Sequence, residues 1–160
     1  MIIAHRCNLN GPSENENTVG AMLECIGAGF LVEIDIHLID SKLFIGHDLV
    51  QEFHKEIDIE LLLQYANKLF IHCKNIEALL YLRGYNELCV FGHSLDEFVL
   101  TSHLDVFCGV GIARKGCICV MPELHTRKFS KEELEVCQHI LTDFPYRYKN
   151  EIDSNSFGQK

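Results

Sequence analysis

The 160-residue sequence is poor in basic residues and in proline, and it contains no long apolar run. It has 14 lysines and arginines against 23 aspartates and glutamates, which gives a formal net charge of −9. Because a nucleic-acid backbone requires a cationic surface, this balance argues against nucleic acid as a partner. No apolar run approaches the roughly 20 residues of a membrane-spanning helix. Only three prolines and an apolar fraction of 48% indicate a globular chain rather than a disordered one.

The N-terminus lacks the basic and apolar segments of an export signal, so the sequence predicts a cytoplasmic protein that begins at Met1. Most of the eight cysteines lie within apolar runs. We expect them to be small buried side chains rather than a disulfide framework. There is no Cys-x-x-Cys pair, and the close pair Cys117 and Cys119 lacks the spacing of a zinc site.

Short and frequent apolar runs indicate many strands. Runs such as VEIDI and CICVM suit a sheet that is covered on both faces. The expected strands are Ile2–Arg6, Val32–His37, Leu43–Gly46, Leu69–Lys74, Leu88–His93, Phe98–Thr101, Val106–Cys108, Cys117–Met121 and His139–Thr142. The expected helices run from Asn17 or Thr18 to Gly27, over Asp58–Lys68 and Asn75–Arg83, and from Ser130 to about Gln138.

The number and spacing of these elements favour a barrel that has lost outer helices. With Leu43–Gly46 set aside as a local hairpin partner, eight strands remain, and helices alternate with the first few. A full (β/α)8 barrel needs about 250 residues, and residues 88–121 carry no convincing helix. We therefore expect one α/β domain over residues 1–149, a compact TIM-like barrel of about eight parallel strands, followed by a polar, frayed tail at 150–160. An open α/β sheet with fewer strands is the alternative.

Polar side chains gather at the carboxyl ends of the expected strands, where α/β folds build their sites. Glu33 and Asp35 are two positions apart, so both carboxylates project from the same face of one strand. Two buried carboxylates repel each other and are costly to desolvate unless a cation lies between them. This pair therefore favours a hard divalent ion such as Mg²⁺ or Ca²⁺. His72 and Lys74 repeat the same spacing on the next strand.

Four motifs occur in a fixed order over the first 50 residues: His5-Arg6, Glu16-Asn17-Thr18, Glu33-x-Asp35 and His47-Asp48. Together they resemble the glycerophosphodiester phosphodiesterase family of the phospholipase C-like phosphodiesterase superfamily, in that family's order and near its spacing. Residues 70–74 are similar to the family's third strand, and residues 141–145 to its closing strand end.

The resemblance implies metal-assisted cleavage of a small phosphodiester, similar to a glycerophosphodiester, within a barrel. It implies His5 and His47 as the acid–base pair, Arg6 and Lys74 as phosphate-binding cations, and Glu33 and Asp35 as metal ligands. The same chemistry follows from general principles, because histidine titrates near neutrality and cations neutralise charge that develops on phosphoryl oxygens. The alternatives are a relative that releases a cyclic phosphate and a non-catalytic relative that binds a phosphorylated metabolite.

The third strand departs from the family, which usually has Glu-x-Lys where this chain has His72-x-Lys74. Imidazole is a softer ligand than a carboxylate and carries one negative charge fewer. As a third ligand, His72 would favour Mn²⁺ or Zn²⁺, or weaken metal binding, unless a carboxylate such as Glu123 completes the site. Cys7 stands where the family has a glycine. The further candidates for the pocket are Glu16, His93, Glu123 and Asp143. Missing outer helices would also leave apolar strand faces that a second copy of the chain could cover.

Overall fold

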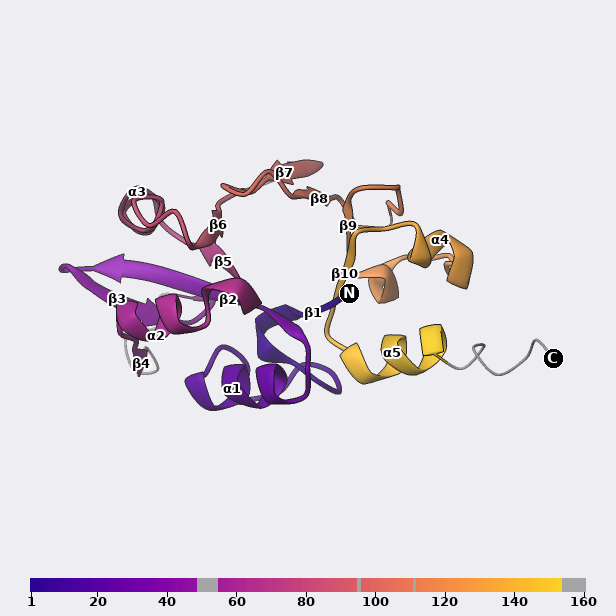
Figure 1. The fold of residues 1–160 in the computed structure, drawn as a ribbon, viewed down its shortest axis with the longest axis horizontal. Helices are drawn as coiled ribbons and strands as arrows, with labels where there is room; N and C mark the ends of the chain where they lie inside the picture. Colours follow the sequence, from indigo (N-terminus) through magenta and orange to yellow (C-terminus); the bar gives the residue numbers. More distant parts are fainter. Residues whose placement is uncertain (49–54, 95, 111, 154–160) are drawn as a thin grey trace.

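The computed structural model describes residues 1–48, 55–94, 96–110 and 112–153 (Figure 1). Its strands form one sheet and are β1 (Ile2–Ala4), β2 (Leu31–Ile39), β3 (Lys42–Ile45), β4 (Lys55–Glu56), β5 (Leu69–Cys73), β6 (Cys89–Phe91), β7 (Phe98–Leu100), β8 (Val106–Cys108), β9 (Ile118–Val120) and β10 (His139–Thr142). Its α-helices are α1 (Val19–Gly27), α2 (Ile59–Gln64), α3 (Ile76–Leu82), α4 (Lys131–Glu135) and α5 (Pro145–Asp153). Short 3₁₀ helices are η1 (His5–Cys7), η2 (Ala66–Lys68) and η3 (Pro122–Leu124).

The sheet follows the order β6-β5-β2-β1-β10-β9-β8-β7, with β3 and β4 extending from β2 as an antiparallel ribbon. The strand β2 is long enough to pair with three other strands. Its residues 32–36 pair with β5 along one edge, while β1 and then β3 pair along the other edge. In Figure 1 the strands follow a curve, and α1, α2, α3 and α5 lie on its outer side. The fold is therefore a mixed α/β structure built on one curved sheet.

The expectation of about eight parallel strands is corrected at one end of the sheet. Parallel pairing runs from β6 to β8, but β7, expected as a further parallel strand, is antiparallel to β8. The physical reason is the connection, because residues 101–105 alone separate β7 from β8. A parallel neighbour would need a crossover of about a dozen residues or more. Among the described residues no strand ladder joins β6 to β7, so the ladder does not close into a barrel there.

Ser102 joins the two ends of the sheet where the ladder stops. Its N–H donates to the Val90 carbonyl at 2.8 Å. Its Oγ accepts from the Val90 N–H at 3.0 Å and donates to the Leu88 carbonyl at 3.1 Å. We call this junction between β6 and the β7–β8 hairpin the Ser102 seam. A single serine therefore takes the place of part of a strand ladder.

Alternation along β2 and β5 decides which side chains face the inside of the curve. Leu31 of β2 and Phe70 of β5 belong to the apolar core on this inner face. Successive strand residues face opposite sides of a sheet. Glu33, Asp35 and His72 therefore share the inner face with them, and all three are buried.

Most of the helices begin where the sequence places them. Thr18 accepts a hydrogen bond from the Ala21 N–H at 3.1 Å and caps α1. Ser130 and Glu133 form the expected capping box at the start of α4. The helix expected over residues 58–68 is divided into α2 and η2, and α4 ends at Glu135 rather than near Gln138.

The helix α5 was not anticipated from the sequence. It includes residues 150–153, the first part of the stretch expected as a polar tail, and the remainder of that stretch lies outside the described residues. Proline is favoured in the first turn of a helix, so Pro145 was an available signal. Over the ranges that the structure describes, none of the helices has the length and apolar character needed to cross a membrane.

Candidate functional site

The carboxyl ends of the inner strands surround a cavity of about 390 Å³. Eight of the residues selected from the sequence line it, namely His5, Arg6, Glu33, Asp35, His47, His72, Lys74 and His93. Three other candidates for the pocket do not line it. Glu16 contacts Arg6, and Asp143 contacts His5. Glu123 accepts a hydrogen bond from the Asp143 N–H at 2.9 Å. Those three residues support the cavity rather than form its surface.

The turn after β1 brings Arg6 to the acidic pair. Arg6 and Cys7 adopt the left-handed backbone region, with φ values of 48° and 64°, which ends β1 at Ala4. This backbone region is one that glycine adopts most readily, although Cys7 occupies it here. The Arg6 N–H donates to Glu33 Oε2 at 2.9 Å. The backbone turn is therefore fixed directly to the strand that carries the carboxylates.

Asp35 is the most heavily contacted side chain of the cavity. Its carboxylate lies 2.9 Å from His72 Nδ1, 3.4 Å from Arg6 Nε and 3.7 Å from Lys74 Nζ. Asn17 donates to Asp35 Oδ2 at 2.8 Å and accepts from the Asp35 N–H at 3.0 Å. Burial opposes ionisation of Asp35, but His72, Lys74 and Asn17 together lower its pKa to about 2. Asp35 is therefore an anion surrounded by cations and donors.

Glu33 has the opposite electrostatic character. Burial and the negative charge of Asp35 raise the pKa of Glu33 to about 7, although His5 and Arg6 oppose this shift. Burial likewise lowers the pKa of His72 despite its contact with Asp35. Burial is the main cause in both cases and shifts both groups toward their uncharged forms.

Glu33, Asp35 and His72 can hold a metal ion. Ligand atoms of the three side chains lie within 4.8 Å of one another. Two carboxylates and one imidazole form a donor set that suits divalent ions of intermediate softness. A bound cation would also relieve the repulsion that raises the pKa of Glu33. The donor set and its electrostatics therefore fit a divalent metal ion.

His5 is held by a chain of polar contacts that spans the two ends of the sequence. Its Nδ1 lies 2.8 Å from Asp143 Oδ1, and Asn8 donates to the same oxygen at 2.9 Å. Burial lowers the pKa of His5, but Asp143 and the charge of Glu33 outweigh it, so the pKa lies above the ordinary value. Since Nδ1 is engaged, the other ring nitrogen of His5 is the one available to the cavity.

His47 approaches the cavity from the loop after β3. It is partly exposed, and its Nδ1 lies 2.8 Å from Asp48 Oδ1. Both histidines of the expected acid–base pair therefore line one cavity, and each has a carboxylate on Nδ1. Such a contact orients an imidazole ring and selects the nitrogen that faces the substrate.

Sequence reasoning missed the apolar part of the cavity. Phe91, Phe98, Val99, Phe107, Val110, Val120 and Leu141 also line it. These residues come from strands β6 to β10 and the adjoining loops, and in a sequence they look the same as ordinary core positions. Alternation within strands of three residues is too short a signal to separate a cavity wall from a core.

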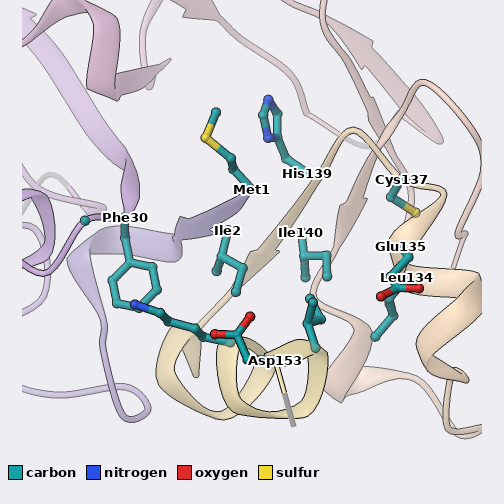
Figure 2. A pocket seen from close by; sticks show the side chains of 12 residues that line it. Met1, Ile2, Phe30, Leu134, Glu135, Cys137, His139, Ile140 and Asp153 are labelled. Carbon is teal, nitrogen blue, oxygen red and sulfur yellow. The ribbon is translucent and has the colours of Figure 1, made fainter. Parts of the chain in front are cut away.

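A second cavity, of about 340 Å³, lies at the opposite, amino-terminal ends of the strands (Figure 2). Apolar residues such as Ile2, Phe30, Leu134 and Ile140 line much of it, with Glu135 and Asp153 at its edge. Among the described residues, the cluster of histidine and carboxylates that could hold a metal ion lies in the first cavity and not in this one. The first cavity is therefore the candidate site.

The structure is similar to the crystal structure of a glycerophosphoryl diester phosphodiesterase from Parabacteroides distasonis ATCC 8503, with a TM-score of 0.56. The alignment covers 96% of this chain and 86% of the bacterial chain at 13% sequence identity. The chain shares the fold of that phosphodiesterase. No protein-family model and no curated protein sequence matches this chain.

Proposed function

We propose that this protein is a metal-dependent phosphodiesterase that cleaves a small phosphodiester similar to a glycerophosphodiester. One observation carries the proposal: two imidazoles, two cations and a metal-binding cluster converge in a single cavity. The glycerophosphodiesterase-like fold supports it, because in folds of this kind the site lies at the carboxyl ends of the strands. In this proposal the partner is a small phosphodiester rather than a nucleic acid, in keeping with the net charge of −9.

Glu33, Asp35 and His72 would hold the divalent ion. Mn²⁺ and Zn²⁺ suit the imidazole in this donor set, and Mg²⁺ and Ca²⁺ suit the carboxylates. When bound, the ion supplies positive charge to the phosphoryl oxygens and acidifies water. Asn17 keeps Asp35 oriented through its two reciprocal hydrogen bonds, so the ligand is preorganised.

Arg6 and Lys74 would bind the phosphodiester anion. Both line the cavity and lie within 3.7 Å of Asp35, one on the turn after β1 and the other just after β5. Negative charge grows on the phosphoryl oxygens during the reaction, and fixed cations at short range stabilise that charge. Glu16, at 3.6 Å from Arg6 Nη1, limits the movement of the guanidinium group.

His5 and His47 would transfer the protons. The raised pKa of His5 favours the protonated form of its ring, which suits the donor to the departing alkoxide oxygen. His47 would accept the proton of the attacking oxygen as the new phosphorus–oxygen bond forms. The bond from phosphorus to the leaving oxygen then breaks, and the proton from His5 yields a neutral alcohol.

The proposal is tested with purified protein and glycerophosphodiesters in the presence of Mn²⁺, Mg²⁺, Zn²⁺, Ca²⁺ or EDTA. We expect turnover that requires a metal and that falls at least about 100-fold in His5→Ala and in Asp35→Asn. His125→Ala is the matched control, because His125 lies outside the lining of the cavity. Circular dichroism verifies that each variant is folded. Wild-type turnover in folded Asp35→Asn would show that the site is wrongly assigned.

A further inference from the structure

The candidate cavity has two chemically different walls. The polar wall comes from the ends of β1, β2 and β5 and from the loop after β3, and it carries the imidazoles, cations and carboxylates described above. The other wall comes from β6 to β9 and the loop after β8. We define it as the apolar wall, consisting of Phe91, Val99, Phe107, Val110 and Val120.

Stacked rings connect the two walls. His72, which contacts Asp35, lies 4.9 Å from Phe91 between ring centroids, with the planes 7° apart. His93 stacks on His72 at 4.7 Å, again with the planes 7° apart. Phe91 in turn stacks on Phe107 at 4.6 Å. A continuous stack of aromatic rings therefore leads from the candidate metal cluster into the apolar wall.

The apolar wall extends outward to exposed residues. Phe107 and Phe91 are each 5% exposed, Val99 is half-buried, and Val110 is 51% exposed. All four residues line the cavity. Apolar side chains that are contiguous with a cavity and open to water are typical of a ligand-binding surface. Asp96 and Glu97 also line the cavity, but both are exposed, so water solvates their charges.

We propose that the apolar wall binds the alcohol substituent of the substrate, and that this substituent is neutral and apolar. This inference rests on the proposed function, which places the phosphate at Arg6 and Lys74. A phosphate held there has the aromatic surface of His72 and Phe91 beside it, and its ester group extends along the apolar wall. The volume of about 390 Å³ accommodates a phosphodiester with one substituent of the size of a ring or a short branched chain.

A neutral alcohol is favoured over a cationic one because the faces of Phe91, which would attract a cation, are occupied by His72 and Phe107. A quaternary ammonium group against these rings would lose its water in the wall, while the carboxylates of Asp96 and Glu97 remain at the exposed rim. Two groups of the same shape bury the same apolar area, so a preference of about tenfold or more comes from the cost of removing the charged group from water.

The test compares two esters of glycerol phosphate that have the same shape and differ in charge. One carries choline, and the other carries 3,3-dimethylbutanol, in which carbon replaces the quaternary nitrogen. We expect kcat/KM to be about tenfold or more higher for the neutral ester. Equal values, or a preference for the choline ester, would overturn the inference while the proposed phosphodiesterase function stands.

A pair of variants on β7 tests whether the wall causes the preference. Val99→Ser should lower the ratio of the two kcat/KM values several-fold, because Val99 lies on the inner face opposite Phe107 and lines the cavity. Leu100→Ser is the matched control, since Leu100 lies on the same strand, is 56% exposed and does not line the cavity. An unchanged ratio in Val99→Ser, or the same change in Leu100→Ser, would contradict the assignment of the wall.

Binding measurements separate this inference from the proposed function. If neither ester is hydrolysed, the proposed function fails, and calorimetry with 3,3-dimethylbutyl phosphate and phosphocholine then tests the wall directly. Tenfold tighter binding of the neutral compound, lost in Val99→Ser, supports the wall in a protein that binds without turnover. Equal binding of the two compounds, or no binding of either, overturns the inference.

Discussion

At the scale of single residues, Asp143 controls a histidine that is far from it in the sequence. The pKa of His5 is raised above its ordinary value by Asp143 and Glu33 against the effect of burial. Asp143→Asn removes the negative charge, so we expect the pKa of His5 to fall. The limb of the pH–rate profile that reports the protonated imidazole then moves to lower pH, and kcat falls about tenfold or more.

Two measurements check this expectation for Asp143→Asn. The titration of His5 followed by NMR gives its pKa directly, and the pH dependence of phosphodiester turnover gives the kinetic effect. A merely structural role would reduce stability without moving the titration of His5. An identical His5 midpoint in the wild-type protein and the variant would contradict the role of Asp143.

The residues of the polar wall were largely accessible from the sequence. Strand alternation placed Glu33 and Asp35 on one face, and the His5-Arg6 and His72-x-Lys74 motifs marked strand ends. The partner of His5 was beyond this reasoning, because Asp143 lies 138 positions away and only the pairing of β1 with β10 brings it close. Local patterns reveal which side chains share a face, but not which distant loop meets them.

At the scale of elements, the side chain of Asn75 connects α3 to β2 by hydrogen bonds. Asn75 Oδ1 accepts from the Ala78 N–H at 3.2 Å, which caps the helix, and from the Leu38 N–H at 3.1 Å. Its Nδ2 also donates to the Leu38 carbonyl at 2.8 Å. Asn75→Ala removes the cap and two bonds to β2, so we expect the free energy of unfolding to fall by about 2–3 kcal/mol.

The matched control for Asn75→Ala is Thr18→Ala at the start of α1. Thr18 accepts from the Ala21 N–H and donates to the Asn15 carbonyl, so it ties the helix only to its own preceding turn. We expect a loss of about 1 kcal/mol for this variant. Urea denaturation of both variants measures the difference, and equal losses would show that the bonds of Asn75 to β2 contribute nothing.

The elements themselves were predicted best where their signals are local. Caps, a capping box and β-branched runs identified α1, α4 and the long strand β2. The arrangement at β7 was predicted wrongly, because a three-residue apolar run does not indicate the direction of its neighbour. The length of the connection at residues 101–105 was the better signal, since it permits a hairpin and not a crossover.

At the scale of the whole molecule, the eight cysteines are free thiols, as the sequence predicted. Burial raises the pKa of Cys25, Cys73 and Cys119 to about 12. The thiolate is the reactive form, so these side chains react slowly near neutral pH in the folded protein. Cys108 and Cys137, which are only partly buried, should be modified before the others.

Labelling with N-ethylmaleimide and intact-mass analysis check this order. We expect at most two rapid additions at pH 7.5, faster labelling as the pH rises, and eight additions in denaturant. Peptide mapping identifies the first two sites. Rapid addition at all eight thiols of the folded chain would contradict the buried arrangement.

In the Ser102 seam one hydroxyl group makes two hydrogen bonds to the β6 side, beside the backbone bond from the Ser102 N–H to the Val90 carbonyl. Ser102→Ala leaves the Val90 N–H without its side-chain acceptor, so we expect the free energy of unfolding to fall by about 1–3 kcal/mol. Ser102→Thr keeps the hydroxyl and serves as the control. Chemical denaturation of both variants measures the effect, and a loss as large in Ser102→Thr would assign it to packing instead.

Phe91 and Phe107 stack on each other from opposite sides of the Ser102 seam, one on β6 and the other on β8. A ligand that contacts both rings therefore contacts β6 and β8 at the same time and holds the two sides of the Ser102 seam together. Occupancy of the cavity and opening of the junction are then linked reciprocally, since a ligand that binds only the closed form stabilises that form by mass action. Amide hydrogen exchange at Val90 and Ser102 becomes a reporter of occupancy, slowing as the cavity fills.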